Sequence, residues 1–457
     1  MDPILHAPKP LDRIMLSELL GALSHALDLS EGQPAGHCVR CSRIGVMVGR
    51  EIGLGKDELV ELYYALLLKD LGCSSNAARI CELYLTDDLS FKQDFKLIDG
   101  SLPQALRFVL SHTGLKAGLA ERFRAIVNIF QNGGEIAREL IETRCHRGAD
   151  IARKMRFSEP VAEGIKNLDE HWDGGGKPLG LRGTAIPIYS RLALLAQVAD
   201  VFYIANGPEA ALREARNRAG TWFDPDLVAA FERIAAQPGF WDTIGTEDGS
   251  ETVPLLPQQA SVPVDDDYLD DIAAAFAQVV DSKSPYTSGH SERVTLFTDM
   301  IAEQLEFTAE RRRWLKRAAL LHDIGKLGVS NAILDKPDKL DDHEWEIMRK
   351  HSAHSEAILS RIGAFGDLAP IAGAHHERLD GKGYPRGLAG DQICLDTRII
   401  TTADIFDALT ADRPYRAAMP VTKALAIMSG MIGTQIDADC FAALRRALGR
   451  VDETLAA

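Results

Sequence analysis

Residues 319–326 read ALLHDIGK, an apolar run that ends in an adjacent histidine and aspartate. Around this run, over residues 310–325, apolar side chains recur at three- and four-residue spacing, which predicts an amphipathic helix. Other stretches with this spacing are 16–29, 56–72 and 270–282. Alternating, strand-like runs are scarce. The sequence therefore predicts an all-α fold.

The position of the histidine and aspartate on this helix matters for chemistry. His322 shares one stripe of the helix with Leu315 and Ala319, so the His322–Asp323 step is expected where a core-facing helix meets its neighbours. Asp404 likewise shares a face of a later predicted helix with apolar residues. A carboxylate directed at an apolar interior is costly unless it is paired or binds a metal. This cost is the physical argument for a metal site.

Composition sets the class of protein. The chain has 457 residues, a net charge of −15 and 46% hydrophobic residues, which is ordinary for a globular protein of two or three domains. The acidic balance opposes binding to nucleic acid polymers. We find no apolar run near the ~18 residues that span a bilayer and no signal peptide, so we expect no membrane association and a cytoplasmic location. The seven cysteines, an odd number, are expected to be reduced.

An acidic, proline-containing stretch over 246–266 reads as a linker. It separates a domain over 1–245 from a domain over 267–457. The two sides look like copies of one unit: GHCVRCSRI and ALLLKDLG in the first match GHSERVTLF and ALLHDIGK in the second. The histidine of the first motif precedes the aspartate of the second by 33 positions in both copies (70 − 37 and 323 − 290). Tandem duplication is the simplest account.

The second copy concentrates metal-ligand residue types, because seven of the 13 histidines lie between His290 and His376. The candidate ligands are His290, His322, Asp323, His351, His375, His376 and Asp404. Two cations ~3.5–4 Å apart can polarise a phosphodiester and lower the pKa of a water. We therefore expect two divalent metals with Asp323 bridging them. Mixed nitrogen and carboxylate ligands suit iron, manganese, zinc or nickel, and their affinity order does not choose among them. Iron or manganese is the first expectation, with zinc or nickel as alternatives.

The motifs of the second copy, taken together, resemble the HD-GYP family of phosphodiesterases. They are GHSERV, LLHDIGK, MRKH, HHERLDGKGYPRGLAG and ADIFDALTADRPYR, in the family's order over 283–416. The resemblance implies an all-helical, HD-type domain that hydrolyses a cyclic dinucleotide at a metal centre. One implied metal shell contains His290, His322, Asp323 and Asp404, and the other contains Asp323, His351, His375 and His376. Members of the three-metal type carry a carboxylate where this chain has Tyr286, so two metals are expected.

The resemblance also implies contacts to the substrate. Lys326 matches the family lysine that contacts the scissile phosphate, and it joins Asp323 as a catalytic candidate. The loop that names the family corresponds to Asp380, Gly381, Gly383, Tyr384 and Pro385. We expect its glycines to let the backbone approach the ligand, and Tyr384 to meet a base or ribose. Arg413 and Arg416 are expected to hold phosphate oxygens, with helix bracing as the alternative.

The first copy reads as degenerate. His37, Asp70, His146 and Asp200 are interpreted as retained, with an insertion of 48 residues before His146 (76 positions against 28). Lys69 replaces His322, and Leu168 and Asp169 replace the histidine pair. A protonated lysine cannot bind a metal. We expect this copy to be structural, with a regulatory ligand pocket, a cover for the active site or a homodimer surface as alternatives.

Several functions fit these residues. Cyclic di-GMP is the first expected substrate, and 3',3'-cyclic GMP-AMP, which presents the same backbone, is the second. One rival is an HD-type nucleotide phosphohydrolase, but a single metal would not need His351, His375 and His376. Another rival is a cyclic dinucleotide receptor without activity. The intact ligand set of the second copy disfavours this receptor, whereas the damaged first copy would suit it.

Overall fold

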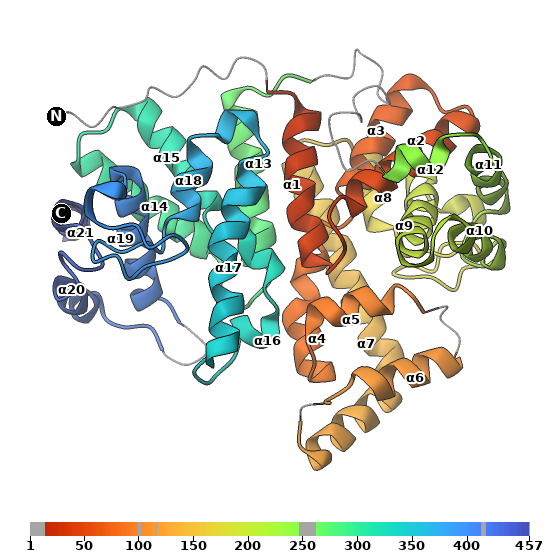
Figure 1. Ribbon diagram of the computed structural model, residues 1–457, viewed down its shortest axis with the longest axis horizontal. Coiled ribbons are helices and arrows are strands. Elements are labelled where there is room, and N and C mark those ends of the chain that lie inside the picture. Colours follow the sequence, from red (N-terminus) through yellow and green to blue (C-terminus); the bar gives the residue numbers. More distant parts are fainter. Residues whose placement is uncertain (1–13, 99–101, 116, 246–261, 413–416, 457) are drawn as a thin grey trace. The chain divides into compact units, whose positions relative to one another are not determined.

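The computed structural model describes residues 14–98, 102–115, 117–245, 262–412 and 417–456. They form two compact units, one over 15–263 and the other over 264–457 together with Ile14. Within the described residues both units are helical, with isolated bridges in place of strands (Figure 1). The predicted all-α fold is confirmed. Arg413, Arg416 and most of the predicted linker lie outside the described residues.

The N-terminal unit is built from a long helix, α7, and shorter helices. Its α-helices are α1 Leu16–Ser30, α2 His37–Glu51, α3 Lys56–Leu67, α4 Ala77–Tyr84, α5 Asp88–Phe95, α6 Leu102–His112, α7 Leu119–Lys154, α8 Glu159–Lys166, α9 Ile188–Asn206, α10 Pro208–Asn217, α11 Pro225–Ala235 and α12 Phe240–Gly245. Short 3-10 turns are η1 Cys73–Asn76 and η2 Gly183–Ala185. Helix α2 packs against α3 and α9, and α7 packs against α8 and η1.

The C-terminal unit repeats this plan without α4 to α6. Its α-helices are α13 Asp266–Asp281, α14 His290–Gln304, α15 Ala309–Leu321, α16 Asn331–Leu334, α17 Asp342–Leu359, α18 Leu368–Gly373, α19 Leu395–Thr410, α20 Val421–Ser429 and α21 Ala438–Ala456. Its 3-10 turns are η5 Ile324–Gly328, η6 Gly363–Phe365 and η7 Gly390–Gln392. Helix α14 packs against α15 and α19, and α17 packs against η5. These contacts correspond to those of α2 and α7.

Local signals explain where the helices of this unit begin. The side chain of Thr308 accepts a hydrogen bond from the Arg311 amide at the start of α15. Asp341 and Glu344 form a capping box at the start of α17. Helix α14 begins after Gly289, whose φ of 67° lies in the left-handed region that glycine adopts without penalty. These starts place His290 at the head of α14 and His351 well inside α17.

One helix tests the expectation that no segment could span a membrane. Among the described residues, α9 is long and apolar enough to do so by length and composition. However, 67% of its most apolar window is buried inside the protein, as in the core helix of a globular domain. The sequence reading missed this stretch because Arg191 and Asp200 interrupt it.

Candidate metal centre

Seven candidate ligands from five segments of the C-terminal unit come together. His290 is the first residue of α14, and His351 lies on α17. His322 and Asp323 form the step between α15 and η5, while His375 and His376 follow α18 and Asp404 lies on α19. All are buried except His376, which is partly buried. Helix packing alone therefore gathers the whole predicted set.

Asp323 lies at the centre of this cluster, and its two carboxylate oxygens face different histidines. Oδ2 lies 3.3 Å from His290 Nε2 and 3.2 Å from His322 Nε2. Oδ1 lies 3.5 Å from His351 Nε2 and 3.6 Å from His375 Nε2. A carboxylate between two sets of imidazoles has the arrangement of a ligand shared by two cations.

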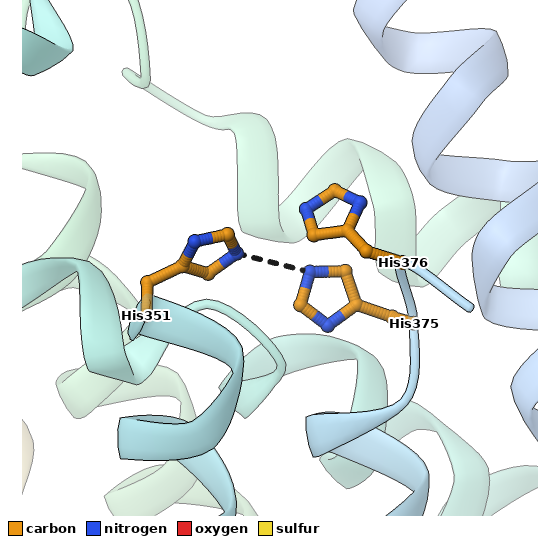
Figure 2. Close-up of side chains that lie close together, drawn as sticks. All are labelled: His351, His375 and His376. Carbon is orange, nitrogen blue, oxygen red and sulfur yellow. Dashed lines mark hydrogen bonds between the residues drawn. The ribbon is translucent and has the colours of Figure 1, made fainter. Parts of the chain in front are cut away.

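The remaining ligands fall into two groups on either side of Asp323. Ligand atoms of His290, His322 and Asp404 lie within 4.8 Å of one another, and so do those of His351, His375 and His376. Figure 2 shows the second group, with His351 reaching from its helix toward the adjacent pair and its Nε2 3.4 Å from His375 Nε2. Each group can hold one ion in the assignment implied by the family resemblance.

Unpartnered polar atoms support a metal at this place. His290 Nε2, His322 Nε2 and Asp323 Oδ1 are buried and have no hydrogen-bond partner among the described residues. Buried polar atoms are otherwise almost always paired. All three point into the cluster, so bound cations would satisfy them. The nitrogen and carboxylate donors fit a divalent transition metal.

The buried histidines differ in protonation state. Burial lowers the pKa of His351 to about 4 and that of His375 to about 3, so both are neutral at pH 7. Burial also disfavours protonated His290, but the adjacent carboxylates of Asp323 and Asp407 outweigh it and raise its pKa to about 9, so this ring must lose a proton to bind a metal. Burial alone would raise the pKa of Asp323, whereas the charges of His322 and Lys326 hold it well below its usual range. The carboxylate is therefore ionised.

A second layer of contacts orients the imidazoles. The Nδ1 atoms of His322, His351 and His375 lie 2.5 to 2.7 Å from backbone carbonyl oxygens three residues earlier. Each ring therefore turns Nε2 toward the cluster, which is a common arrangement for metal-binding histidine. These helical carbonyls leave no signal in the sequence.

His290 instead uses a carboxylate that sequence reasoning missed. Its Nδ1 lies 2.7 Å from Asp407 Oδ2. The side chain of Arg293 donates to the same carboxylate. Asp407 lies three residues after Asp404 on α19, and Arg293 three residues after His290 on α14. That helical spacing was the available signal.

The predicted substrate-contacting residues lie around this centre. Lys326 Nζ donates to Asp323 Oδ2. The Tyr384 ring lies 4.8 Å from the His376 ring, and the Arg349 guanidinium lies 5.6 Å from the Tyr384 ring. Arg349 was not among the predicted residues, although it lies in the quoted MRKH motif. A cation and an aromatic ring are thus available beside the metal ligands.

One glycine of the loop has a structural role that the sequence did not predict. A side chain on Gly383 would lie 2.6 Å from the His376 carbonyl oxygen and 2.5 Å from the Arg378 nitrogen. Gly383 therefore lets the loop fold back on its own chain, and the approach of the loop backbone to a ligand stays a prediction. Gly381 adopts a left-handed φ of 73°.

Carboxylates brace the same loop. The side chain of Asp380 pairs with Arg378 and accepts from the Lys382 amide, so its side-chain bonds lie within the loop. Buried Glu377, missed by sequence reasoning, accepts from the amides of Arg386 and Leu388. The loop that carries Tyr384 and Pro385 is therefore held in place before any ligand binds.

Two sequence assignments in the first copy require correction. His37 Nδ1 lies 2.6 Å from Asp200 Oδ2, and Arg40 donates to the same carboxylate. Asp200 thus makes the contacts that Asp407 makes in the second copy. Its counterpart is not Asp404, whose position is taken by Gln197, three residues earlier.

The assignment of His146 to the position of His351 is also wrong. A side chain on Gly72 would clash with the Arg144 carbonyl oxygen. In the second copy, a side chain on Gly325 would clash in the same way with the His351 carbonyl oxygen. Arg144 is therefore the counterpart of His351, and His146 is exposed. The insertion is then 46 residues (74 positions from Asp70 against 28). The sequence pattern could not place the end of an insertion inside a continuous helix.

Cationic side chains replace metal ligands in this copy. The Lys69 ammonium pairs with Asp70 and lies 3.1 Å from His37 Nε2. Arg144 pairs with Asp169, the counterpart of His376. Of the seven ligand positions only His37 and Asp70 are kept, so the structure offers no metal centre equivalent to the second one in the described part of this unit.

Comparison with known proteins agrees with this geometry. An HD-domain family model matches residues 116–227 and 274–440, which is more than half of the chain. The chain belongs to the HD-GYP family of HD-domain phosphodiesterases. A 3'3'-cGAMP-specific phosphodiesterase 3 of Vibrio cholerae is 56% identical over 95% of this chain and 94% of its own length.

Two further relatives widen the HD-GYP comparison. A crystal structure of a V. cholerae cyclic GMP-AMP-specific phosphodiesterase covers 96% of this chain and 98% of its own, with 50% identity and a TM-score of 0.66. A cyclic di-GMP phosphodiesterase response regulator of Xanthomonas campestris is 38% identical over 39% of this chain and 47% of its own length. The first match spans both units.

Proposed function

We propose that this HD-GYP protein is a metal-dependent phosphodiesterase whose preferred substrate is 3',3'-cyclic GMP-AMP. The supporting observation is the 56% identity, across nearly the full length of both chains, to a relative named as specific for that dinucleotide. The sequence expectation put cyclic di-GMP first. The compared relatives that are named for cyclic di-GMP match over only 36 to 39% of this chain, and the 38% identical X. campestris protein matches over 39% of it. Cyclic di-GMP is the second substrate to test.

The centre gives each residue a role in this reaction. Two divalent ions, when bound, would polarise the phosphodiester and lower the pKa of a nucleophilic water. Asp323, ionised and facing both histidine groups, would hold the two ions together, while the outer contacts keep the imidazoles in place. Lys326 would neutralise charge on the scissile phosphate. Tyr384 and Arg349 would position the nucleotide beside the centre.

We assign catalysis to the C-terminal unit over 267–457. The unit over 1–245 is proposed to have no catalytic activity. We propose iron or manganese as the metal, because imidazole and carboxylate donors suit both. Purification without oxygen, followed by elemental analysis and replacement with each metal, tests this choice. Activity restored by zinc alone would contradict it.

Hydrolysis assays on the wild-type protein and on a variant that lacks one candidate metal ligand test the substrate assignment. Wild-type protein should convert 3',3'-cyclic GMP-AMP to a linear dinucleotide or mononucleotides, whereas an Asp323→Ala variant should not. If the wild-type protein binds the dinucleotide but releases it uncleaved in the presence of metal, the chain is a receptor and the proposal is wrong.

A further inference from the structure

The N-terminal unit contains a cavity of about 340 Å³. It occupies the place where the second copy has its metal centre. Four of its lining residues are the counterparts of His351, His376, Tyr384 and Asp404 in that copy: Arg144, Asp169, Lys177 and Gln197. The duplication has thus kept a hollow at this position while replacing the metal ligands.

The 46-residue insertion builds part of the wall. Helix α4 contributes Ile80 and Tyr84, α5 contributes Phe91 and Lys92, and Lys96 directly follows α5. Lys92 and Lys96 both lie near Glu31, at 3.3 and 2.9 Å from its carboxylate oxygens. The insertion therefore brings both cations and aromatic rings to the cavity.

The cavity is positively charged in an acidic protein. Its charged lining residues are the cations Lys92, Lys96, Arg144 and Lys177 and the carboxylates Glu31 and Asp169. Four cations against two carboxylates leave a net charge of +2, although the chain carries −15. Cations that converge in a low-dielectric hollow favour an anionic ligand.

Aromatic side chains line the same cavity. The rings of Tyr84 and Phe91 lie 4.3 Å apart, and His171 stacks on Trp222 at 4.2 Å. Burial lowers the pKa of His171 to about 4, so its ring is neutral at pH 7. These surfaces suit a planar ring.

The size of the cavity narrows the choice of ligand. Protein interiors contain few voids much larger than a water molecule, so a hollow of this size indicates space for a ligand. Small-molecule pockets span roughly 300–1,000 Å³, and about 340 Å³ lies at the lower end. This favours a mononucleotide over a dinucleotide.

We propose that this cavity is a second nucleotide site, which binds a nucleoside monophosphate with its phosphate at the lysine and arginine side chains and its base against the aromatic rings. The site does not depend on the substrate of the C-terminal unit, because it shares no residue with the metal centre. A metal is not required, since the Lys69 ammonium already neutralises Asp70.

Calorimetric titration of the full chain with GMP and with AMP tests this site. Lys96→Met removes one cation and leaves Lys92 to pair with Glu31, so the fold should persist while affinity falls at least tenfold. Ala137 lines the cavity and is exposed, so Ala137→Trp should block its mouth. Lys56→Met, the same change at an exposed lysine outside the cavity, should leave binding unchanged.

Further titrations separate the possible sources of binding. Guanosine and inorganic phosphate, each offering half of the ligand, should bind at least tenfold more weakly than GMP. An Asp323→Ala chain should keep the site. The proposal is overturned if GMP and AMP fail to bind at millimolar concentration, or if both cavity variants bind normally. The proposal is also overturned if GMP and AMP binding is lost in the Asp323→Ala chain but not in the cavity variants. Selective binding of the intact cyclic dinucleotide at this cavity would overturn it as well.

Discussion

At the scale of single residues, the centre depends on how each ligand is held as much as on which ligand is present. Asp323 faces four imidazoles through two oxygens, and three histidines are oriented by carbonyl groups of their own helical turns. Such orientation shows only in coordinates. Residue types and family motifs predicted the seven candidate ligands that cluster here, whereas Asp407 and Glu377 were missed.

Substitutions of Asp323 and Lys326 should have different effects on metal binding and on turnover. Asp323→Ala should remove bound metal and activity together, because the shared carboxylate is lost. Lys326→Ala should keep metal but lower kcat by about 10²–10³-fold, as expected when one charge-stabilising donor is removed. Elemental analysis and steady-state rates on one preparation measure both. Lys339→Ala, at an exposed lysine, serves as control, and metal-replete, fully active Asp323→Ala would refute the assignment.

Asp407 should act as a positioning residue through His290. Asp407→Asn keeps the size of the side chain but weakens its bonds to His290 and Arg293, so metal affinity should fall about 10–100-fold. Chelator competition measures this affinity, and excess metal should restore kcat. Asp396→Asn, which disturbs a similar pair with Arg311, is the matched control. Unchanged metal affinity in Asp407→Asn would contradict the role.

Metal uptake should depend on pH through His290. Its pKa of about 9 in the metal-free protein means that the ring is protonated at pH 7, and a metal must displace that proton. Affinity should therefore rise by about tenfold per pH unit up to about pH 9 and then level off. Titrations in buffers of different ionisation enthalpy count the released protons. Affinity that does not change between pH 6 and 8 would argue against this protonation state.

At the scale of elements, close backbone contacts set the distance between helices. Gly325 lies in η5 where a side chain would meet the His351 carbonyl oxygen on α17 at 2.0 Å. Apolar periodicity predicted helices around the motifs, including α15, which ends just before His322, and α19, which carries Asp404. Periodicity gave no measure of such contacts. Motif matching between the copies placed the counterparts of His351 and Asp404 two and three residues away from their true positions.

Gly325→Ala should force η5 away from α17 and so separate Asp323 from His351. We expect a loss of about 1–3 kcal/mol in the stability of the C-terminal unit, as for other overpacked sites, together with weaker metal binding. Thermal unfolding with and without metal measures both effects. Gly449→Ala on α21, where an added carbon meets nothing within 4 Å, should be tolerated. Equal behaviour of the two variants would show that the contact is unimportant.

At the scale of the whole molecule, duplication followed by divergence explains the two units. The repeated motifs were visible in the sequence, and so was the loss of the histidine pair in the first copy. The cavity of the first copy was not predictable, because it depends on how helices α4 and α5 of the insertion fold over the former ligand positions. The inserted sequence resembles nothing in the second copy, so no internal comparison could reveal its role.

The most direct test of the central claim compares hydrolysis of 3',3'-cyclic GMP-AMP and cyclic di-GMP by protein purified without oxygen, with bound metal measured on the same sample. We predict about two metals per chain and a kcat/KM at least tenfold higher for the mixed dinucleotide. Metal-loaded protein that cleaves neither substrate, or that prefers cyclic di-GMP, would contradict the account.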